Sequence, residues 1–269
     1  GASPVNIHKK QGLWVVGNGE LPADAMVETT IENKMKDLTF SELVTAKKFY
    51  ERFDLTDDRA IRVTVKGNGK VLRDIIVGKK SSVGDLSYVK LSDRNEVYLA
   101  GGNLASECDR TMDTVRDKKL FSLTPDSIES VTVNAHGEKF TLVREAEKKS
   151  EKKDPMKDAP APKGKWIVEG RAGEVNSDKI TEYLSEFGSV LAQNFPDEKT
   201  VAGRTRSSVG DLTIKAKGKT ITFTIYGKND TDKGNTYLCK STELPYYANV
   251  TSWKVERLMI KSADLFKKK

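Results

Sequence analysis

The side chains that most often carry acid–base chemistry are few in this sequence. Its two histidines are His8, near the start, and His136, within the run Asn134-Ala135-His136-Gly137. A histidine that shuttles protons needs a positioned partner, and neither histidine has one that the sequence identifies. The residue types around His136 are typical of a hairpin turn. We therefore interpret His136 as a polar turn residue.

The two cysteines, Cys108 and Cys239, fall in different halves of the chain. Cys108 lies on the apolar face of a helix predicted over residues 103–116, where a thiol usually packs as a small core residue. That face is formed by Leu104, Cys108, Met112 and Val115. Cys239 falls in a predicted strand. A disulfide would have to join the two halves, so we expect free thiols.

Two acidic residues have the spacing that opens a calcium-binding loop. Asp230 and Asp232 match its first two ligand positions, but Asn235 stands where the loop needs glycine, and Ser241 where it needs a bidentate glutamate. A solvated turn is the better interpretation. Clusters of Cys, His or carboxylate residues at metal-ligand spacing are also missing from the sequence. We expect no metal site.

Two glycine-rich runs, Gly17-Asn18-Gly19 and Gly67-Asn68-Gly69, superficially suggest phosphate loops. Neither has the strand–GxGxxG–helix or GxxxxGK[ST] arrangement that directs backbone N–H groups at phosphate, and both are interpreted as turns. The GxSxG motif of serine hydrolases is absent from the sequence. The sequence therefore predicts no catalytic residues, no cofactor and no enzymatic activity.

Aromatic residues provide the remaining candidates for a binding site. Tyr246, Tyr247 and Trp253 are close together in the sequence, and exposed rings of this kind stack on sugars or grip a peptide. Tyr247 aligns with Tyr98 of the first half and falls in a predicted strand, which favours packing in a sheet. The three residues are thus weak ligand-binding candidates.

The elements that must position these residues occur twice. Gly12-Leu13-Trp14-Val15-Val16 returns as Gly164-Lys165-Trp166-Ile167-Val168, and a run of later residue pairs returns at offsets of 145 to 151 residues. A single long period indicates duplicated domains and not a solenoid. The repeated Trp14 and Trp166 are interpreted as structural. The sequence predicts a first repeat at 12–145, a charged linker at 146–163 and a second repeat at 164–266.

Within each predicted repeat, a short strand is followed by a helix and then by alternating strands. Pro22 suits a first helical position, and Val27, Ile31, Met35 and Leu38 form an apolar stripe behind it. In the second repeat, Asn176 or Ser177 caps a helix whose stripe is Ile180, Leu184, Phe187 and Leu191. Turns at 66–69 and 217–219 predict antiparallel hairpins. The fold class is α+β, with each repeat a helix packed on a mostly antiparallel sheet.

The formal charge of +7 raises the question of nucleic-acid binding. Residues 144–165 and the tail Lys267–Lys269 contribute three positive charges each, and Lys9–Lys10 contribute two, so the remainder is close to neutral. Nucleic-acid-binding proteins usually gather basic charge on one folded face, which argues against that class here. The sequence has no apolar run of transmembrane length. Gly1 is typical of a residue left by tag cleavage, which suggests that an anchoring segment once preceded it.

Several motifs together resemble a known bacterial family, domain-of-unknown-function family 4340. The motifs are Trp14–Val16, Phe49–Leu55, Ile76–Lys79, Tyr88–Leu91, Val97–Leu99 and Val115–Phe121. The resemblance covers the chain in two passes, and its most specific segment is Arg116–Phe121. Where the family has Tyr-Gly-Leu, this chain has Phe53-Asp54-Leu55. The resemblance carries over no catalytic residues.

The resemblance implies a membrane-anchored domain on the extracytoplasmic, periplasmic face of the cell envelope. Such domains are often encoded beside ABC-type transporter or gliding-motility components. We therefore expect a non-enzymatic interaction domain, accessory to an envelope transport or motility system, whose partner is a protein such as a transporter component. A domain that binds envelope glycan or peptide is the alternative. Nucleic acid is not an expected partner, and the membrane is contacted only through the missing N-terminal anchor.

Overall fold

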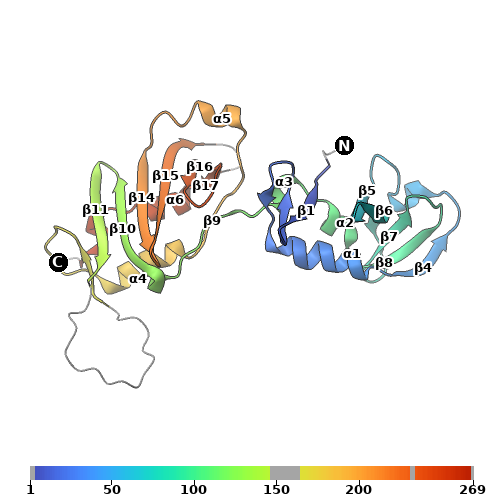
Figure 1. Ribbon diagram of the computed structural model, residues 1–269, viewed down its shortest axis with the longest axis horizontal. Helices are drawn as coiled ribbons and strands as arrows, with labels where there is room; N and C mark the ends of the chain where they lie inside the picture. Colours follow the sequence, from blue (N-terminus) through green and yellow to red (C-terminus); the bar gives the residue numbers. More distant parts are fainter. Residues whose placement is uncertain (1–3, 146–163, 231–233, 268–269) are drawn as a thin grey trace, which may run out of the picture. The chain divides into compact units, whose positions relative to one another are not determined.

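The computed structural model describes residues 4–145, 164–230 and 234–267 (Figure 1). The described chain is mixed, with mostly antiparallel sheets and short helices, which confirms the predicted α+β class. It divides into two compact units, residues 1–117 and 118–269. The segment predicted as a linker, 146–163, lies outside the described residues.

The boundary between the units differs from the predicted one. The hairpin of β10 (Ile128–Ala135) and β11 (Glu138–Arg144) was predicted to close the first repeat, but β10 pairs antiparallel with β14 (Gly210–Ala216) of the second unit. Its inward side chains Val131 and Val133 are fully buried in the second core. The boundary therefore falls between Asp117 and Lys118, because a hairpin pattern specifies the hairpin itself but not the sheet it joins.

The first unit begins with a small antiparallel sheet of β1 (Ile7–Lys10), β2 (Leu13–Val16) and β3 (Leu21–Pro22). Pro22 pairs with Val15 at the edge of this sheet and does not start the helix. Proline is tolerated at a sheet edge, where its missing N–H breaks no ladder. Trp14 lies in β2 and donates from Nε1 to Glu32 at 3.2 Å.

The first helical segment contributes buried residues to two separate hydrophobic cores of the first unit. A π-helical turn, Val27–Glu32, continues into α1 (Asn33–Asp37). Val27 packs with Val16 and Val115 beside the small sheet, whereas Met35 and Leu38 pack against the larger one. Of the predicted apolar stripe, Val27, Met35 and Leu38 are therefore buried, but in two different places, and the Ile31 side chain lies outside the described part of the structure.

The larger sheet of the first unit has the order β4-β8-β7-β6-β5. Its strands are β4 (Phe40–Thr45), β5 (Ile61–Gly67), β6 (Lys70–Lys80), β7 (Leu86–Leu91) and β8 (Val97–Gly101). The last four form an antiparallel meander, as predicted. Alternate side chains such as Ile75, Val77 and Val89 are almost completely buried on one face, which is the period of a half-covered strand.

The helix predicted over 103–116 is two helices, α2 (Leu104–Cys108) and α3 (Met112–Val115). Asp109 leaves the helical conformation, and Thr111 opens the next helix with a capping box. The predicted apolar face is divided accordingly. Leu104 and Cys108 pack in the core of the larger sheet, whereas Met112 and Val115 pack beside the small sheet.

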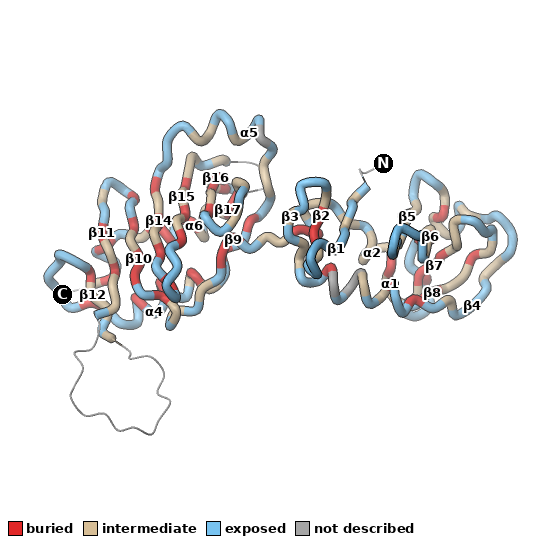
Figure 2. The backbone as a smooth tube through the Cα atoms, viewed as in Figure 1, coloured by how far each residue is buried: buried red, intermediate tan, exposed pale blue. Residues whose placement is uncertain are grey.

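The second unit contains a seven-stranded antiparallel sheet in the order β12-β11-β10-β14-β15-β16-β17. The strands not yet bounded are β12 (Trp166–Val168), β15 (Lys219–Asn229), β16 (Thr236–Ser241) and β17 (Tyr247–Thr251). Buried residues follow β10, β14 and β15 in Figure 2. A two-stranded sheet joins β9 (Lys119–Phe121) to β13 (Val190–Leu191), and Phe121 packs in the same core.

Three short helices accompany this sheet: α4 (Ser177–Ser185), α5 (Glu198–Ala202) and α6 (Ser252–Leu258). Asn176 caps α4 as predicted, because its side chain accepts from the backbone N–H groups of Asp178 and Lys179. Of the predicted stripe, Ile180, Leu184 and Phe187 are buried, whereas Leu191 is exposed and belongs to β13. The buried stripe therefore ends at Phe187, in the 3-10 turn Glu186–Gly188 that follows α4.

In the described ranges, four hairpins close with the same two-residue geometry. Both central residues have positive φ at Gln11-Gly12, Asn68-Gly69, His136-Gly137 and Lys217-Gly218. This type I′ turn matches the right-handed twist of the paired strands and favours glycine at its second position. The predicted turn role of Gly67–Gly69 and of His136 is therefore confirmed.

Candidate interaction surface

The three aromatic candidates do not form one cluster. Tyr246 packs edge-on against Phe195, with ring centroids 5.2 Å apart. Tyr247 starts β17, and its ring lies 5.8 Å from that of Tyr226. Trp253 lies in α6, beyond the other end of β17. Four strand steps of about 3.3 Å each separate the two ends of β17, so Trp253 is remote from the tyrosines.

Tyr247 belongs to the sheet, as its alignment with Tyr98 suggested. Lys240 lies opposite it in β16, and the ammonium nitrogen is 4.7 Å from the centroid of the Tyr247 ring. Burial raises the pKa of the Tyr226 hydroxyl, and the nearby Tyr247 hydroxyl raises it further. Lys240 and Tyr247 are cross-strand neighbours, whereas Tyr226 lies in β15, on the far side of β16. Packing across the sheet therefore accounts for Tyr247 without a ligand.

Trp253 is different, because 59% of it is exposed. The Lys254 ammonium and the Arg257 guanidinium each lie 5.8 Å from the centroid of its ring, within the range of cation–π attraction. Both cations also bind Glu186: Lys254 Nζ donates to Oε2 at 2.7 Å, and Arg257 donates to Oε1 at 2.6 Å. We call these four residues the Trp253 surface.

Glu186 binds both cations of the Trp253 surface from a largely buried position. It follows directly after α4, and its side chain is only 12% exposed, as is that of Lys254. A carboxylate at the C-terminal end of a helix is opposed by the helix dipole, so it needs the two cations. Burial alone would raise the pKa of Glu186, but the hydrogen bonds from Lys254 and Arg257 outweigh it and hold the pKa below its usual value.

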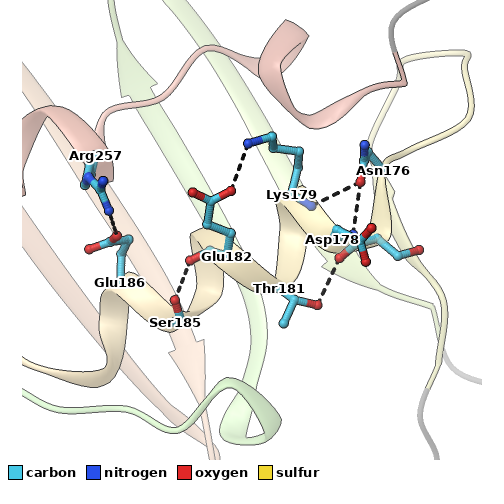
Figure 3. Close-up of polar contacts among 9 residues, drawn as sticks. Asn176, Asp178, Lys179, Thr181, Glu182, Ser185, Glu186 and Arg257 are labelled. Atoms are coloured by element: carbon cyan, nitrogen blue, oxygen red, sulfur yellow. Dashed lines mark hydrogen bonds and ion pairs between the residues drawn. The ribbon is translucent and has the colours of Figure 1, made fainter.

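The rest of α4 presents polar side chains in a row beside Glu186 (Figure 3). Lys179 pairs with Glu182 at 2.8 Å, and both side chains are well exposed. Thr181 and Ser185 donate to carbonyl groups of the preceding turn. Figure 3 shows Arg257 reaching across to Glu186. Sequence reasoning singled out Trp253 but missed its partners, although the spacing of Trp253 and Arg257 puts both on one face of a helix.

The thiols and the imidazole have structural roles. Both cysteines are free. Burial raises the pKa of the Cys108 thiol to about 11, and Cys239 is completely buried in β16. The Nε2 atom of His136 lies 2.7 Å from the Met259 carbonyl oxygen, which links the β10–β11 turn to the end of α6.

A labelling experiment tests this assignment. We expect both native thiols to react slowly with a thiol reagent at pH 8, and Cys239 more slowly than Cys108, because a buried, protonated thiol is a poor nucleophile. Denaturation in guanidinium should release both. Labelling of Cys108 in the native protein as fast as that of a free cysteine would contradict the core assignment.

A metal site would need the described ranges to bring metal-ligating side chains together. They contain no group of three or more His, Cys, Asp or Glu residues placed to hold a metal ion. Asp232 lies outside the described residues. No helix in the described ranges is long and apolar enough to cross a membrane.

One open depression, with a volume of about 460 Å³, lies in the first unit between the start of β5 and α2. Its charged rim consists of Asp54, Arg59, Lys79 and Asp109. Arg59 already pairs with Asp54 at 3.2 Å, so the rim is partly neutralised. The rim of the depression therefore carries charges of both signs.

Comparison with known proteins identifies the family of this chain. The family described as Domain of unknown function (DUF4340) matches residues 14–205, which is well over half of the chain. The chain therefore belongs to this family. The match crosses the boundary between the two units. No curated protein and no solved structure matches the chain.

Proposed function

We propose that this chain is a non-enzymatic, extracytoplasmic interaction domain that docks a protein partner through the Trp253 surface. In this proposal the partner belongs to an envelope ABC-type transport or motility system. A segment preceding Gly1 anchors the domain to the membrane. The location and the kind of partner are supported by the family resemblance, and the docking surface by the geometry around Trp253.

The observation that carries the proposal is an exposed indole held in place by its neighbours. A tryptophan side chain buries 150–250 Å² when covered, and tryptophan and arginine are the residue types most enriched among interface hot spots. Lys254 and Arg257 are fixed on the buried carboxylate of Glu186, so the ring lies beside a pre-formed polar rim. Pre-ordering lowers the entropy lost on binding.

We further propose that the meander β5–β8 of the first unit and the run β14–β17 of the second, which is also an antiparallel meander, are tandem copies. Several observations support this. The first hairpin of each meander closes in the same way. Gly67 lies opposite Lys70 in one and Ala216 opposite Lys219 in the other, and each pair encloses a two-residue type I′ turn. The second hairpin of each contains a bulge, between Val77 and Lys80 or between Ile225 and Lys228. Each last strand also has an antiparallel neighbour on its outer side, β4 for β8 and the Asn194 bridge for β17.

The duplication does not extend to the surroundings of the repeated tryptophans. Trp14 lies in the three-stranded sheet, with Lys9 at 5.0 Å from its ring. Trp166 lies in β12 of the seven-stranded sheet, with Arg144 at 4.9 Å from its ring. Each indole has a cation at its face, but the two belong to sheets of different size.

Substitution of Trp253 tests the docking proposal. We expect Trp253→Ala to leave the fold intact, because the side chain is mostly exposed, and to weaken capture of a partner from solubilised envelope fractions by about thirtyfold, the effect of a hot-spot residue. Immobilised wild-type and variant chains are compared by quantitative mass spectrometry. Val209→Ala, which alters another exposed apolar residue of the same unit, is the control.

Equal capture by wild type and Trp253→Ala would overturn docking at this surface. The alternative, binding of envelope glycan or peptide, rests on the same exposed ring, because indole faces stack on sugars. Titration with envelope glycan fragments, followed by tryptophan fluorescence, separates the two. Saturable quenching that Trp253→Ala abolishes, without a captured protein, would favour the glycan-binding alternative.

A further inference from the structure

The outer edge of β5 is the most unusual feature of the first unit that the Trp253 surface leaves unexplained. β5 is the first strand of its meander and pairs with β6 on one side. Within the described ranges, no strand or isolated bridge pairs with its other side. β5 is seven residues long and ends at an exposed turn, so it presents a row of backbone donors and acceptors.

The second unit shows how the corresponding edge is covered. β14 is the first strand of the second meander, and β10 lies along its outer side in an antiparallel register that runs from Ile128 opposite Ala216 to Ala135 opposite Gly210. With β10 in place, Leu212 and Ile214 are completely buried. The matching side chains of β5, Val63 and Val65, are only half-buried.

The side chains near the β5 edge favour a partner strand with apolar and acidic residues. Val71 and Leu72, just after the β5–β6 turn, are 56% and 65% exposed and extend the apolar surface. Lys66 and Lys70 flank the same turn and are exposed. In the second unit, β10 places the Glu129 carboxylate on the backbone N–H of Gly218, in the corresponding turn, at 3.2 Å.

We propose that the edge of β5 accepts an extended strand from a protein partner, antiparallel to β5, in the way that β14 accepts β10. The strand has β-branched apolar residues at alternate positions and an acidic residue near the Lys66–Lys70 turn. Main-chain hydrogen bonds supply the affinity, and the alternating side chains supply the specificity. In the β5–β6 pairing, Val65 lies opposite Arg73 and Lys66 opposite Val71, so the extra residue of the bulge, Leu72, is in β6 and β5 itself is continuous. This inference rests on the proposed function, binding of a protein, but not on the Trp253 surface.

A second copy of β5 fits this edge less well. In an antiparallel pair centred on Thr64, Arg62 of one copy would lie opposite Lys66 of the other, twice. Like charges directly opposite each other destabilise a sheet. An acidic residue near the turn instead meets Lys66 and Lys70 favourably, whereas Arg62 is already paired with Asp74.

The probe is a capped synthetic peptide with the sequence of residues 128–135, added to the full-length chain. Among the β5 amides Ile61–Val65, we expect at least tenfold slower hydrogen exchange of those that point away from β6, and no change in β14, whose edge is occupied. A peptide with lysine in place of Val131 and Val133 should give no protection. The chain variant Val63→Lys, which places a charge on the inward side of the edge, should also lose the effect, with Trp14 fluorescence as the check on its folding.

A charge exchange provides a second test on exposed positions that do not threaten the fold. Lys66→Glu with Lys70→Glu should weaken binding of the wild-type peptide about tenfold, and a peptide carrying Glu129→Lys should restore it. Absence of β5 protection at millimolar peptide, or protection at another strand, would overturn the inference. So would a concentration-dependent dimer of the chain that Val63→Lys dissolves, because the edge would then bind a second copy. The peptide assay needs no natural partner, so its failure is separate from failure of capture through Trp253.

Discussion

Replacing Glu186 by glutamine is expected to lower the free energy of unfolding of the second unit by about 2 kcal/mol at pH 7, between the cost of losing an exposed ion pair and that of losing a fully buried one. The amide keeps the shape but removes the charge, so Lys254, only 12% exposed, is left without its counter-charge. Arg257 loses the same partner. Urea unfolding followed by circular dichroism measures the change.

The pH dependence of this loss has a definite sign. The pKa of Glu186 is lower in the folded protein than in the unfolded chain, so its charge stabilises the fold at pH values above the unfolded pKa, about 4.3. The contribution is lost as the pH falls through the folded pKa. We therefore expect the difference between wild type and Glu186→Gln to be full at pH 7 and to shrink below about pH 4.

The matched control lies one turn earlier on the same helix. Glu182→Gln also removes a carboxylate from an ion pair, the one that Glu182 forms with Lys179 (Figure 3). Both of these side chains are well exposed. We expect stability close to that of the wild type, because water solvates both partners. Equal losses for the two variants would show that burial does not distinguish Glu186.

Replacing Gly78 by alanine is expected to destabilise the first unit by about 3 kcal/mol or more, the upper range for overpacking a core. A Cβ atom on Gly78 would lie 2.1 Å from the carbonyl oxygen of Phe53 and 3.0 Å from the Leu55 side chain. The first of these neighbours is backbone and cannot rotate away. Unfolding in urea, followed by the fluorescence of Trp14 in a background with Trp166→Phe and Trp253→Phe, measures the change in the first unit alone.

Gly227→Ala is the control, because Gly227-Lys228 has the same dipeptide sequence as Gly78-Lys79 and also lies in the second strand of a hairpin. A Cβ atom on Gly227 would meet nothing within 4 Å. We expect this variant to remain within about 0.5 kcal/mol of the wild type, as for a substitution that meets open space. A loss at Gly227 as large as that at Gly78 would contradict the steric explanation.

The contact at Gly78 also explains why two family motifs occur together. Phe49–Leu55 and Ile76–Lys79 are far apart in the sequence, but Phe53 and Leu55 pack directly on Gly78, and the rings of Phe53 and Tyr88 are 4.7 Å apart. Asp54, where the family has glycine, adopts a left-handed conformation with φ of 53°. Glycine reaches this conformation without strain, and aspartate is among the few other residues that tolerate it. Both motifs are therefore structural in this chain.

Much of the local structure was determined by the sequence itself. The alternation of Ile61, Val63 and Val65 predicted a half-covered strand, Asn176 predicted a helix start, and the Asn68-Gly69 and His136-Gly137 pairs predicted hairpins. These signals are local: they depend on side-chain period, on capping and on the backbone conformations that a residue tolerates. Neighbouring residues suffice to decide them.

The partners of these elements were decided only by the tertiary structure. Whether β10 joins the first or the second sheet depends on which exposed edge and which core it meets, and its own pattern of valines fits either. The helical face over 103–116 looked continuous, but Asp109 and Thr111 divide it between two cores. In the same way, Trp253 was visible in the sequence, but the buried Glu186 that holds its two cations is 67 residues away. Contacts over such separations are set by packing, and no local pattern encodes them.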